Sequence, residues 1–275
     1  MALTIRPKSN GTVPIEAEVL RPDLCADKTA DQIRQLTVQH GNRARPLGEC
    51  FEIEGDPRDE QLVLEGDFSR TKQIGQSMQR GRITVHGPAG MHLGAEMRDG
   101  EIDVQGDAGD WVGAEMRGGL IRIHGSAGHL VGGSYRGSAS GMKGGTIVVH
   151  GDAGNELGCG MRRGVIAVTG NVGDFAGFNL IAGTIVVAGG FGIRCGAGMR
   201  RGSIVSIGTD RQHPELLSTF RFDCEYDPQF LAIYLRYLRA SGFNPDHAGL
   251  NGRYRRYSGD LVALGKGEIL LRDSS

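Results

Sequence analysis

Lysine and tryptophan are scarce in this sequence, and its net charge is close to zero. Its 275 residues include one tryptophan and only five lysines, far fewer lysines than arginines, and the formal net charge is −1. Such a balanced charge gives no indication of bulk nucleic-acid binding. The low lysine content disfavours a hyperthermophilic source, because the proteins of hyperthermophiles are typically rich in Lys and Glu.

Motifs of common catalytic and metal sites are also missing. The five cysteines form no C-x-x-C pair, so the sequence shows no zinc-ribbon or iron–sulfur ligand set. No P-loop or nucleophile elbow occurs. Gly190-Phe-Gly192 has no helix after it, so it is not half of a dinucleotide fingerprint. We therefore expect a chain that is not itself catalytic.

Long apolar runs are absent too. No stretch of about 18 apolar residues occurs, and Met1-Ala-Leu-Thr is not the start of an apolar signal region. Glycine, in contrast, is abundant, with 46 residues that do not follow the G-x-y period of collagen. We expect a cytoplasmic, reduced protein.

The glycines belong to a tandem repeat between residues 61 and 208. Units begin at positions 61, 82, 101, 120, 146, 165, 184 and 203, and five of the intervals are 19 residues long (82 to 101, 101 to 120, 146 to 165, 165 to 184 and 184 to 203). The sixth residue of every unit is glycine, and methionine recurs near the end of nearly every unit. The second residue is always aliphatic: Leu62, Ile83, Ile102, Ile121, Ile147, Ile166, Ile185 and Ile204.

Each unit opens with x-I-x-V-x-G or a close variant, and this alternation predicts a short strand with one buried face. A second alternating run, such as Leu93, Ala95 and Met97, predicts another strand in the same unit. A unit this short cannot bury its apolar face alone, so neighbouring units must stack. The sequence therefore predicts an all-β fold, a right-handed parallel β-helix, with the Ile, Val and Met ladders inside. The rival, a left-handed hexapeptide helix, requires a six-residue period that the glycines do not follow.

The flanking segments are predicted to be small α/β caps. We expect an N-terminal cap over 1–60, the β-helix over 61–208, and a C-terminal cap with one helix over 209–275. In the first cap we expect strands at 3–5 and 15–20 and a helix from Thr29 to about Gln39. In the second we expect a strand pair within 261–271 and a helix that starts at Asp227-Pro228 and ends at Gly242. The predicted apolar face of this helix is Phe230, Ile233, Tyr234, Tyr237 and Leu238.

Two features of the repeat are candidate contact sites. The unit that starts at 120 carries an insertion at 133–141, and such insertions leave a solenoid as loops. Tyr135 and Arg136 are therefore candidate contacts, and a plain surface loop is the alternative. Basic residues also recur at one outward position (Arg98, Arg117, Lys143, Arg162, Arg200), next to Arg80, Arg163 and Arg201.

Stacked like charges repel one another unless opposite charges neutralise them. Glu96 and Glu115 neutralise part of the charge in their own units. No such acidic neighbour occurs in the units of Arg162, Arg163, Arg200 and Arg201. An anionic ligand, or an acidic face of another subunit, would stabilise them. A solvated charged face is the alternative.

Histidine and glutamate columns are two further candidates for chemistry. His86, His124 and His150 share an outward column without a carboxylate or cysteine, so we expect no metal site there. Glu96 and Glu115 stack, and we expect a solvated pair rather than an acid–base pair.

Several motifs together resemble a known family. They are Gly-Asp-Ala-Gly (106–109), Gly-Ala-Glu-Met-Arg-Gly-Gly (113–119), the inserted Gly-Ser-Tyr-Arg-Gly, Gly-Met-Arg-Arg-Gly, and Arg-Arg-Tyr-Ser-Gly-Asp-Leu (255–261). Over nearly the whole chain they resemble the C subunit of formylmethanofuran dehydrogenase. The repeat alone is similar to the C-terminal β-helix of the glutamate synthase large subunit.

The resemblance implies a scaffold subunit whose partners carry the chemistry. One branch is a redox complex with tungsten or molybdenum pterin and iron–sulfur centres on other subunits. The other is a formyltransferase/hydrolase complex, which moves a formyl group from tetrahydromethanopterin to a methanofuran analogue and hydrolyses it to formate. We prefer the second branch because the chain is rich in arginine and poor in lysine.

This branch implies a metal-dependent hydrolase-like subunit and a formyltransferase subunit as partners, with no nucleic acid or membrane partner and no cofactor bound by this chain itself. Because the carriers of this family end in acidic tails, the hypothesis is that such a tail, or an acidic subunit, contacts Arg117, Lys143, Arg162, Arg163, Arg200, Arg201, Tyr135 and Arg136. Three alternatives stay open: a scaffold of the redox complex, an autonomous polyanion-binding β-helix, and a glutamate-synthase-like spacer, against which the caps argue.

Overall fold

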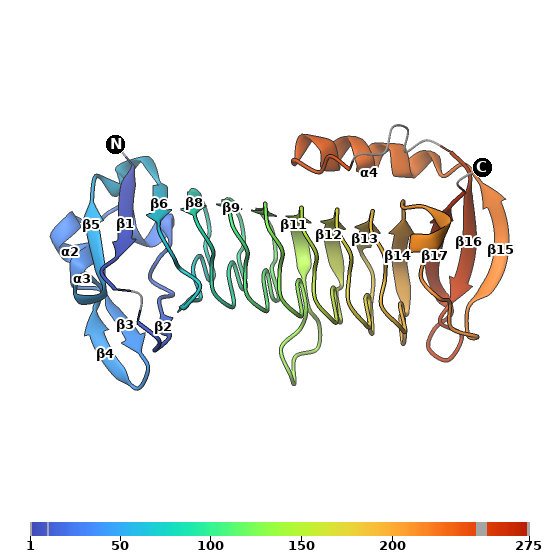
Figure 1. Cartoon of the computed structure of the whole chain (residues 1–275), viewed down its shortest axis with the longest axis horizontal. Helices are drawn as coiled ribbons and strands as arrows, with labels where there is room; N and C mark the ends of the chain where they lie inside the picture. The colour runs from blue at the N-terminus through green and yellow to red at the C-terminus, as the bar shows by residue number, and fades with distance from the viewer. Residues whose placement is uncertain (1, 10, 246–251, 274–275) are drawn as a thin grey trace.

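The computed structural model describes residues 2–9, 11–245 and 252–273. Strands outweigh helices, and most strands belong to one mainly parallel 13-stranded sheet with the order β15-β16-β17-β14-β13-β12-β11-β10-β9-β8-β6-β1-β5. Figure 1 shows an elongated molecule in which the repeat units follow one another along the long axis and the two termini lie at opposite ends.

Each repeat unit begins at, or a few residues after the start of, one strand of this sheet. The strands are β6 (Gln61–Glu65), β8 (Arg82–His86), β9 (Glu101–Val104), β10 (Leu120–Ile123), β11 (Lys143–Val149), β12 (Arg163–Val168), β13 (Thr184–Val187) and β14 (Arg201–Ser206). They pair in parallel with the aliphatic second positions in register, so that Ile102 lies beside both Ile83 and Ile121. The predicted strands and their vertical register are confirmed.

The interior of the stack consists of the predicted ladders. Ile102, Val104 and Met116 are fully buried, as are their counterparts in the neighbouring units. Burial of apolar surface contributes roughly 25 cal/mol per Å², so stability is spread along the whole stack.

The predicted second strand of each unit is wrong. Residues 91–96 form a turn, in which the backbone is left-handed at His92 (φ 63°), Gly94 (φ 61°) and Glu96 (φ 57°). Leu93, Ala95 and Met97 alternate with these residues and are buried. A turn with every second residue left-handed therefore produces the same period of two as an extended strand. Single bridges, such as Ala89 to Ala108, and backbone hydrogen bonds of the turns, such as His92 N–H to the carbonyl of Asp110 (2.8 Å), join the units on this side.

The N-terminal segment continues the stack and adds a small second sheet. Its elements are β1 (Leu3–Pro7), β2 (Ile15–Glu16), α1 (Pro22–Cys25), α2 (Ala30–Arg34), β3 (Thr37–His40), β4 (Arg43–Pro46), α3 (Leu47–Cys50), β5 (Phe51–Glu54) and η1 (Pro57–Asp59). Strand β1 pairs in parallel with β6 and antiparallel with β5. The second sheet has the order β4-β3-β2-β7, where β7 is Thr71–Lys72.

The expected elements of this segment are only partly right. Thr29 is the N-cap of α2, as predicted, and Thr29 and Gln32 form a reciprocal capping box. The helix ends at Arg34 rather than near Gln39, because residues 37–40 pair as β3 with β2 and β4. The strand expected at 15–20 is limited to β2.

The C-terminal segment closes the other end of the sheet. Its elements are η2 (Asp210–Gln212), β15 (Arg221–Tyr226), α4 (Gln229–Ala240), β16 (Tyr254–Gly259) and β17 (Lys266–Arg272). Strand β17 pairs in parallel with β14 and antiparallel with β16, so a late segment supplies the rung after the last repeat. Of the strand pair expected within 261–271, the structure has β17 alone, because residues 261–264 form a turn.

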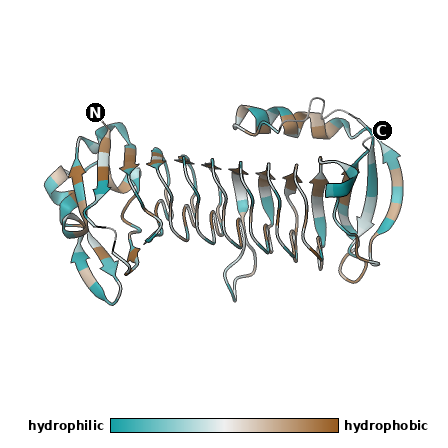
Figure 2. Ribbon diagram, viewed as in Figure 1, coloured by the Kyte–Doolittle hydropathy of each residue, from teal (hydrophilic) through white to brown (hydrophobic). Residues whose placement is uncertain are grey.

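Helix α4 lies along the outer face of the sheet (Figure 1). The buried side chains are Leu231, Leu235 and Leu238, spaced i, i+4 and i+7, whereas Ile233 is 70% exposed. The predicted apolar face is therefore wrong except for Leu238 and the partly buried Tyr234. The helix packs on outward aliphatic residues of the later strands: Val148, Ala167, Val186 and Val205. Figure 2 shows this distribution of apolar residues on the ribbon.

Candidate functional site

The predicted basic residues lie at the ends of the units, within three residues before the strands or at their first residue. The backbone N–H of Arg117 donates to the carbonyl of Met97 (2.7 Å), and that of Arg162 donates to the carbonyl of Met142 (2.8 Å), so this position stacks from unit to unit. We call the following residues the basic strip: Arg98, Arg117, Lys143, Arg162, Arg163, Arg200 and Arg201.

The six arginines of the basic strip are exposed. Within the described part of the chain none of them forms an ion pair, in contrast to Lys143. The strip is interrupted in the unit from 165 to 183, where Ile181 and Ala182 occupy the two basic positions. Its positive charge is thus divided into a longer group before this unit and a shorter one after it.

Lys143 differs from the arginines because it forms an ion pair with Glu115. The Lys143 ammonium lies 3.3 Å from Glu115 Oε2, and the backbone N–H of Tyr135 donates to Oε1 of the same carboxylate (3.4 Å). Burial alone would raise the pKa of Glu115, but hydrogen bonds from Ser138, Lys143 and Tyr135 outweigh it and lower the pKa. Glu115 is only 9% exposed, so the expectation of a solvated carboxylate was wrong for this residue.

The insertion loop, residues 133–141, projects on the side away from α4 in Figure 1. Its Tyr135 folds back onto the stack: the hydroxyl lies 2.9 Å from His92 Nδ1, and the ring stacks at 6.3 Å from Trp111. Burial, with smaller contributions from Glu96 and Glu115, raises the pKa of Tyr135 to about 12. Arg136 is exposed.

The histidine column lies at the ends of strands β8, β10 and β11. The rings of His124 and His150 stack with centroids 5.1 Å apart, and His124 Nε2 lies 3.2 Å from Asp103. His86 pairs with Gln105 instead. No three His, Cys, Asp or Glu side chains in residues 2–9, 11–245 and 252–273 gather closely enough to hold a metal ion.

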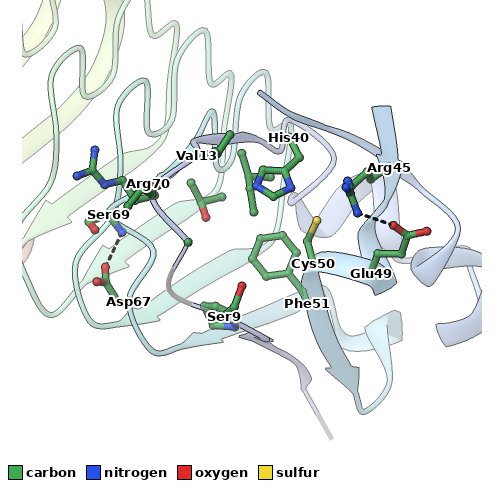
Figure 3. A pocket seen from close by; sticks show the side chains of 15 residues that line it. Ser9, Val13, His40, Arg45, Glu49, Cys50, Phe51, Asp67, Ser69 and Arg70 are labelled. Carbon is green, nitrogen blue, oxygen red and sulfur yellow. Dashed lines mark hydrogen bonds and ion pairs between the residues drawn. The ribbon is translucent and has the colours of Figure 1, made fainter. Parts of the chain in front are cut away.

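A cavity of about 440 Å³ lies in the N-terminal part of the molecule, between the small sheet and the first repeat unit. Figure 3 shows two interactions among its lining residues: Arg45 contacts Glu49 (3.2 Å), and Asp67 accepts the backbone N–H of Ser69 (2.8 Å). None of the predicted site residues lines this cavity. The candidate site therefore remains the basic strip and the face formed by the insertion loop.

Sequence reasoning did not single out His92 and Trp111. Both occupy the same position of the repeat, with left-handed φ angles of 63° and 59°, and Leu130 and Phe175 hold that position in later units. A column of large side chains between the first glycine turn and the basic strip was the available signal, and the chain's one tryptophan belongs to it.

The comparisons with known proteins agree with this architecture. A family model described as GXGXG motif matches residues 64–221, more than half of the chain. The chain belongs to the GXGXG motif family. This GXGXG chain is also 35% identical to a chain in the crystal structure of the formyltransferase/hydrolase complex (FhcABCD) from Methylorubrum extorquens in complex with methylofuran. That match covers 98% of this chain and 99% of the other, with a TM-score of 0.90.

Curated relatives of the GXGXG chain are similar over a shorter stretch. The C subunit of the molybdenum-containing formylmethanofuran dehydrogenase 1 from Methanothermobacter thermautotrophicus is 46% identical over 94 residues, 34% of this chain and 24% of the relative. The C subunit of the tungsten-containing formylmethanofuran dehydrogenase 2 from the same organism is 42% identical over 95 residues, 33% of this chain and 35% of the relative. The matches thus span about a quarter to a third of the relatives' length. The predicted resemblance to the C subunit of this enzyme is confirmed.

None of the described helices of the GXGXG chain combines the length and the hydrophobicity that a membrane span requires.

Proposed function

We propose that this chain is the non-catalytic scaffold subunit of a formyltransferase/hydrolase complex. The complex would move a formyl group between tetrahydromethanopterin and a methanofuran-type carrier and hydrolyse it to formate. The observation that carries the proposal is the end-to-end similarity to a chain of the FhcABCD complex, caps included. The dehydrogenase relatives match over about a third of this chain, which favours the hydrolytic complex over the redox one.

The scaffold itself would be a right-handed parallel β-helix over residues 61–208, between caps formed by 1–60 and 209–275. Support comes from the in-register parallel pairing of successive units and from the single bridges on their second side. Both caps add a parallel rung to the stack, through β1 and β17. Such a rod offers long, rigid faces to several partners at once, here a metal-dependent hydrolase-like subunit and a formyltransferase subunit.

A direct test is to purify the untagged complex from its native source and weigh it intact by mass spectrometry. The expected result is a complex of constant stoichiometry that contains this chain, with formyl transfer and hydrolysis lost when the chain is omitted from a reconstitution. Turnover by the isolated chain, or its isolation as a lone monomer, would overturn the proposal. The second of these outcomes would support the autonomous polyanion-binding module.

The basic strip would hold either the acidic tail of the carrier or an acidic face of a neighbouring subunit. The support is the exposed charge of Arg117, Arg162, Arg163, Arg200 and Arg201, since guanidinium groups bind carboxylates in bidentate fashion. Lys143 and Tyr135 would contribute less, because Glu115 and His92 already engage them.

The test of the strip is the double substitution Arg162→Ala with Arg163→Ala. Carrier retention or complex assembly should fall, and the difference from wild type should shrink at higher salt because screening weakens the contribution of these two charges in the wild type. The matched control is Arg236→Ala with Arg239→Ala, which removes two exposed arginines from α4. If carrier retention and assembly are both unchanged in the strip variant, the role of the basic strip is refuted.

A further inference from the structure

Three aromatic rings from different units form one surface beside the insertion loop. His92 stacks on Trp111 with centroids 5.3 Å apart, and Tyr135 covers both, at 5.6 Å from His92 and 6.3 Å from Trp111. We call these three residues the aromatic face. All three are partly buried, so part of the cluster remains accessible to solvent, whereas the indole nitrogen of Trp111 is itself buried. Burial lowers the pKa of His92 and so favours its uncharged form.

The charges around the aromatic face leave a net negative surplus. Asp110 and Glu96 are partly exposed, lie close enough to act electrostatically on His92 and Tyr135 respectively, and form no ion pair with any described residue. The other carboxylates close to the rings are Glu16 and Glu115, which are already engaged by Lys72 and Lys143. The uncompensated local charge of these ring neighbours is therefore negative, in contrast to the basic strip.

Elsewhere in the chain, a ring at the same position of the repeat contacts a cation. Phe175 occupies the position equivalent to Trp111, and the guanidinium of Arg194 lies 5.5 Å from the centroid of its ring. Arg194 comes from the next unit, so a cation reaches the ring from a neighbouring segment. The rings of the aromatic face lack an equivalent cation among the described residues.

We propose that the aromatic face is a docking surface for an arginine-bearing segment of a partner protein. A guanidinium stacks on an indole or phenol ring and pairs with the flanking carboxylates at the same time. Tryptophan, tyrosine and arginine are also the residues that dominate protein–protein interfaces. The inference rests on the proposed function only in taking the partner to be a subunit of the same complex.

An anionic partner is the competing outcome, because Arg136 is exposed in the same loop. The two cases respond in opposite ways to substitution. Arg136→Ala removes the cation of the loop. This substitution would weaken the binding of an anionic partner, whereas it would leave the binding of an arginine-bearing partner unchanged or strengthen it. Glu96→Gln with Asp110→Asn removes the surplus negative charge, and it keeps the side-chain oxygen with which Asp110 accepts the His129 N–H (2.8 Å).

Because Trp111 is the only tryptophan of the chain, its fluorescence reports on this surface directly. We would titrate the full-length protein with hexa-arginine, hexalysine and hexaglutamate. We expect hexa-arginine to change the emission at a concentration about fivefold lower than hexalysine, because arginine stacks better on indole. Glu96→Gln with Asp110→Asn should weaken the response about tenfold, as loss of close charge partners does at interfaces. The control Asp152→Asn with Glu225→Gln makes the same chemical change elsewhere and should leave it unchanged. A response to hexaglutamate alone, or none to hexa-arginine, overturns the inference.

The second measurement uses the complex assembled by co-expression with the chain's natural partner subunits. The salt concentration that releases the partners should be lower for the Glu96→Gln, Asp110→Asn variant than for wild type or the control. If wild type captures no subunit, the proposed function fails while the peptide titration still tests the aromatic face. If the complex forms but this variant releases its partners at the wild-type salt concentration, the inference fails alone.

Discussion

The ammonium of Lys143 lies 3.3 Å from the carboxylate of Glu115, although the two residues are 28 positions apart in the sequence. They belong to adjacent units of the repeat, and the segment between them contains the whole insertion loop. The same carboxylate receives the backbone N–H of Tyr135 within that loop. Glu115 therefore fixes the base of the loop to the stack, and through Tyr135 it positions the aromatic face.

The substitution Glu115→Gln should destabilise the fold by about 1–3 kcal/mol, because hydrogen bonds to the charged carboxylate are lost. The folded state lowers the pKa of Glu115 below its ordinary value of 4.5, so this stabilisation is present above about pH 4.5 and is lost as the pH falls through the folded value. Urea unfolding between pH 7 and pH 3 checks this. A difference between wild type and variant that stays constant down to pH 3 would show that the charge of Glu115 contributes nothing.

A pair of glycine substitutions separates backbone strain from close packing. Gly119 and Gly137 have nearly the same φ, 86° and 87°. A methyl group at Gly119 would lie 2.7 Å from the carbonyl oxygen of Gly100, whereas none of the atoms around Gly137 is within 4 Å. Gly137→Ala should cost about 1–2 kcal/mol through strain alone. Gly119→Ala should cost about 1–3 kcal/mol more through overpacking, as measured by thermal unfolding. Equal costs would mean that the units can move apart.

Helix α4 provides a matched pair of large aliphatic residues. Leu235 is buried against the outer face of the sheet, and Ile233, two residues earlier, is 70% exposed. Leu235→Ala should destabilise the protein by about 2–5 kcal/mol, whereas Ile233→Ala should change stability by no more than about 0.5 kcal/mol. Denaturant titrations of both variants test this. The reverse order would restore the apolar face expected from the sequence.

Side-chain oxygens that accept backbone N–H groups of the next unit are a further source of stability. Asp110 accepts from His129 (2.8 Å), and Asn155 accepts from Asp174 (2.9 Å) in the same way. Asp110→Ala should cost about 0.5–1.5 kcal/mol because one N–H loses its acceptor. Asp110→Asn keeps an acceptor and should cost less, as measured by chemical denaturation. If asparagine is as damaging as alanine, the charge of Asp110 rather than its hydrogen bond matters.

The repeat predicted the strands and their register because equal spacing forces equal residues to stack. Ile83, Ile102 and Ile121 could be aligned from the sequence for that reason. The turn at 91–96 could not be predicted, since buried residues that alternate with left-handed ones have the period of a strand. The buried face of α4 was also mispredicted, because it depends on outward aliphatic residues of the later strands, such as Val148 and Val186, on which the helix packs.

The candidate site was predicted only where its residues repeat. The basic residues of the strip occupy the same position in most repeat units and were found. The contact of Tyr135 with His92 joins positions 43 residues apart and depends on the path of an insertion, which no column reveals. Glu115 was found as a stacked carboxylate, but its burial follows from the loop above it rather than from its place in the repeat.

The rung that follows β14 comes from residues 266–272 rather than from the next residues in the chain. On the ribosome, where synthesis proceeds from the N-terminus, the units can form one after another as they emerge. The free edge of β14 stays open until β17 has been translated, and an unpaired strand edge invites association with other chains. Nascent chains that stall before residue 266 are therefore the species of this protein most in need of a chaperone.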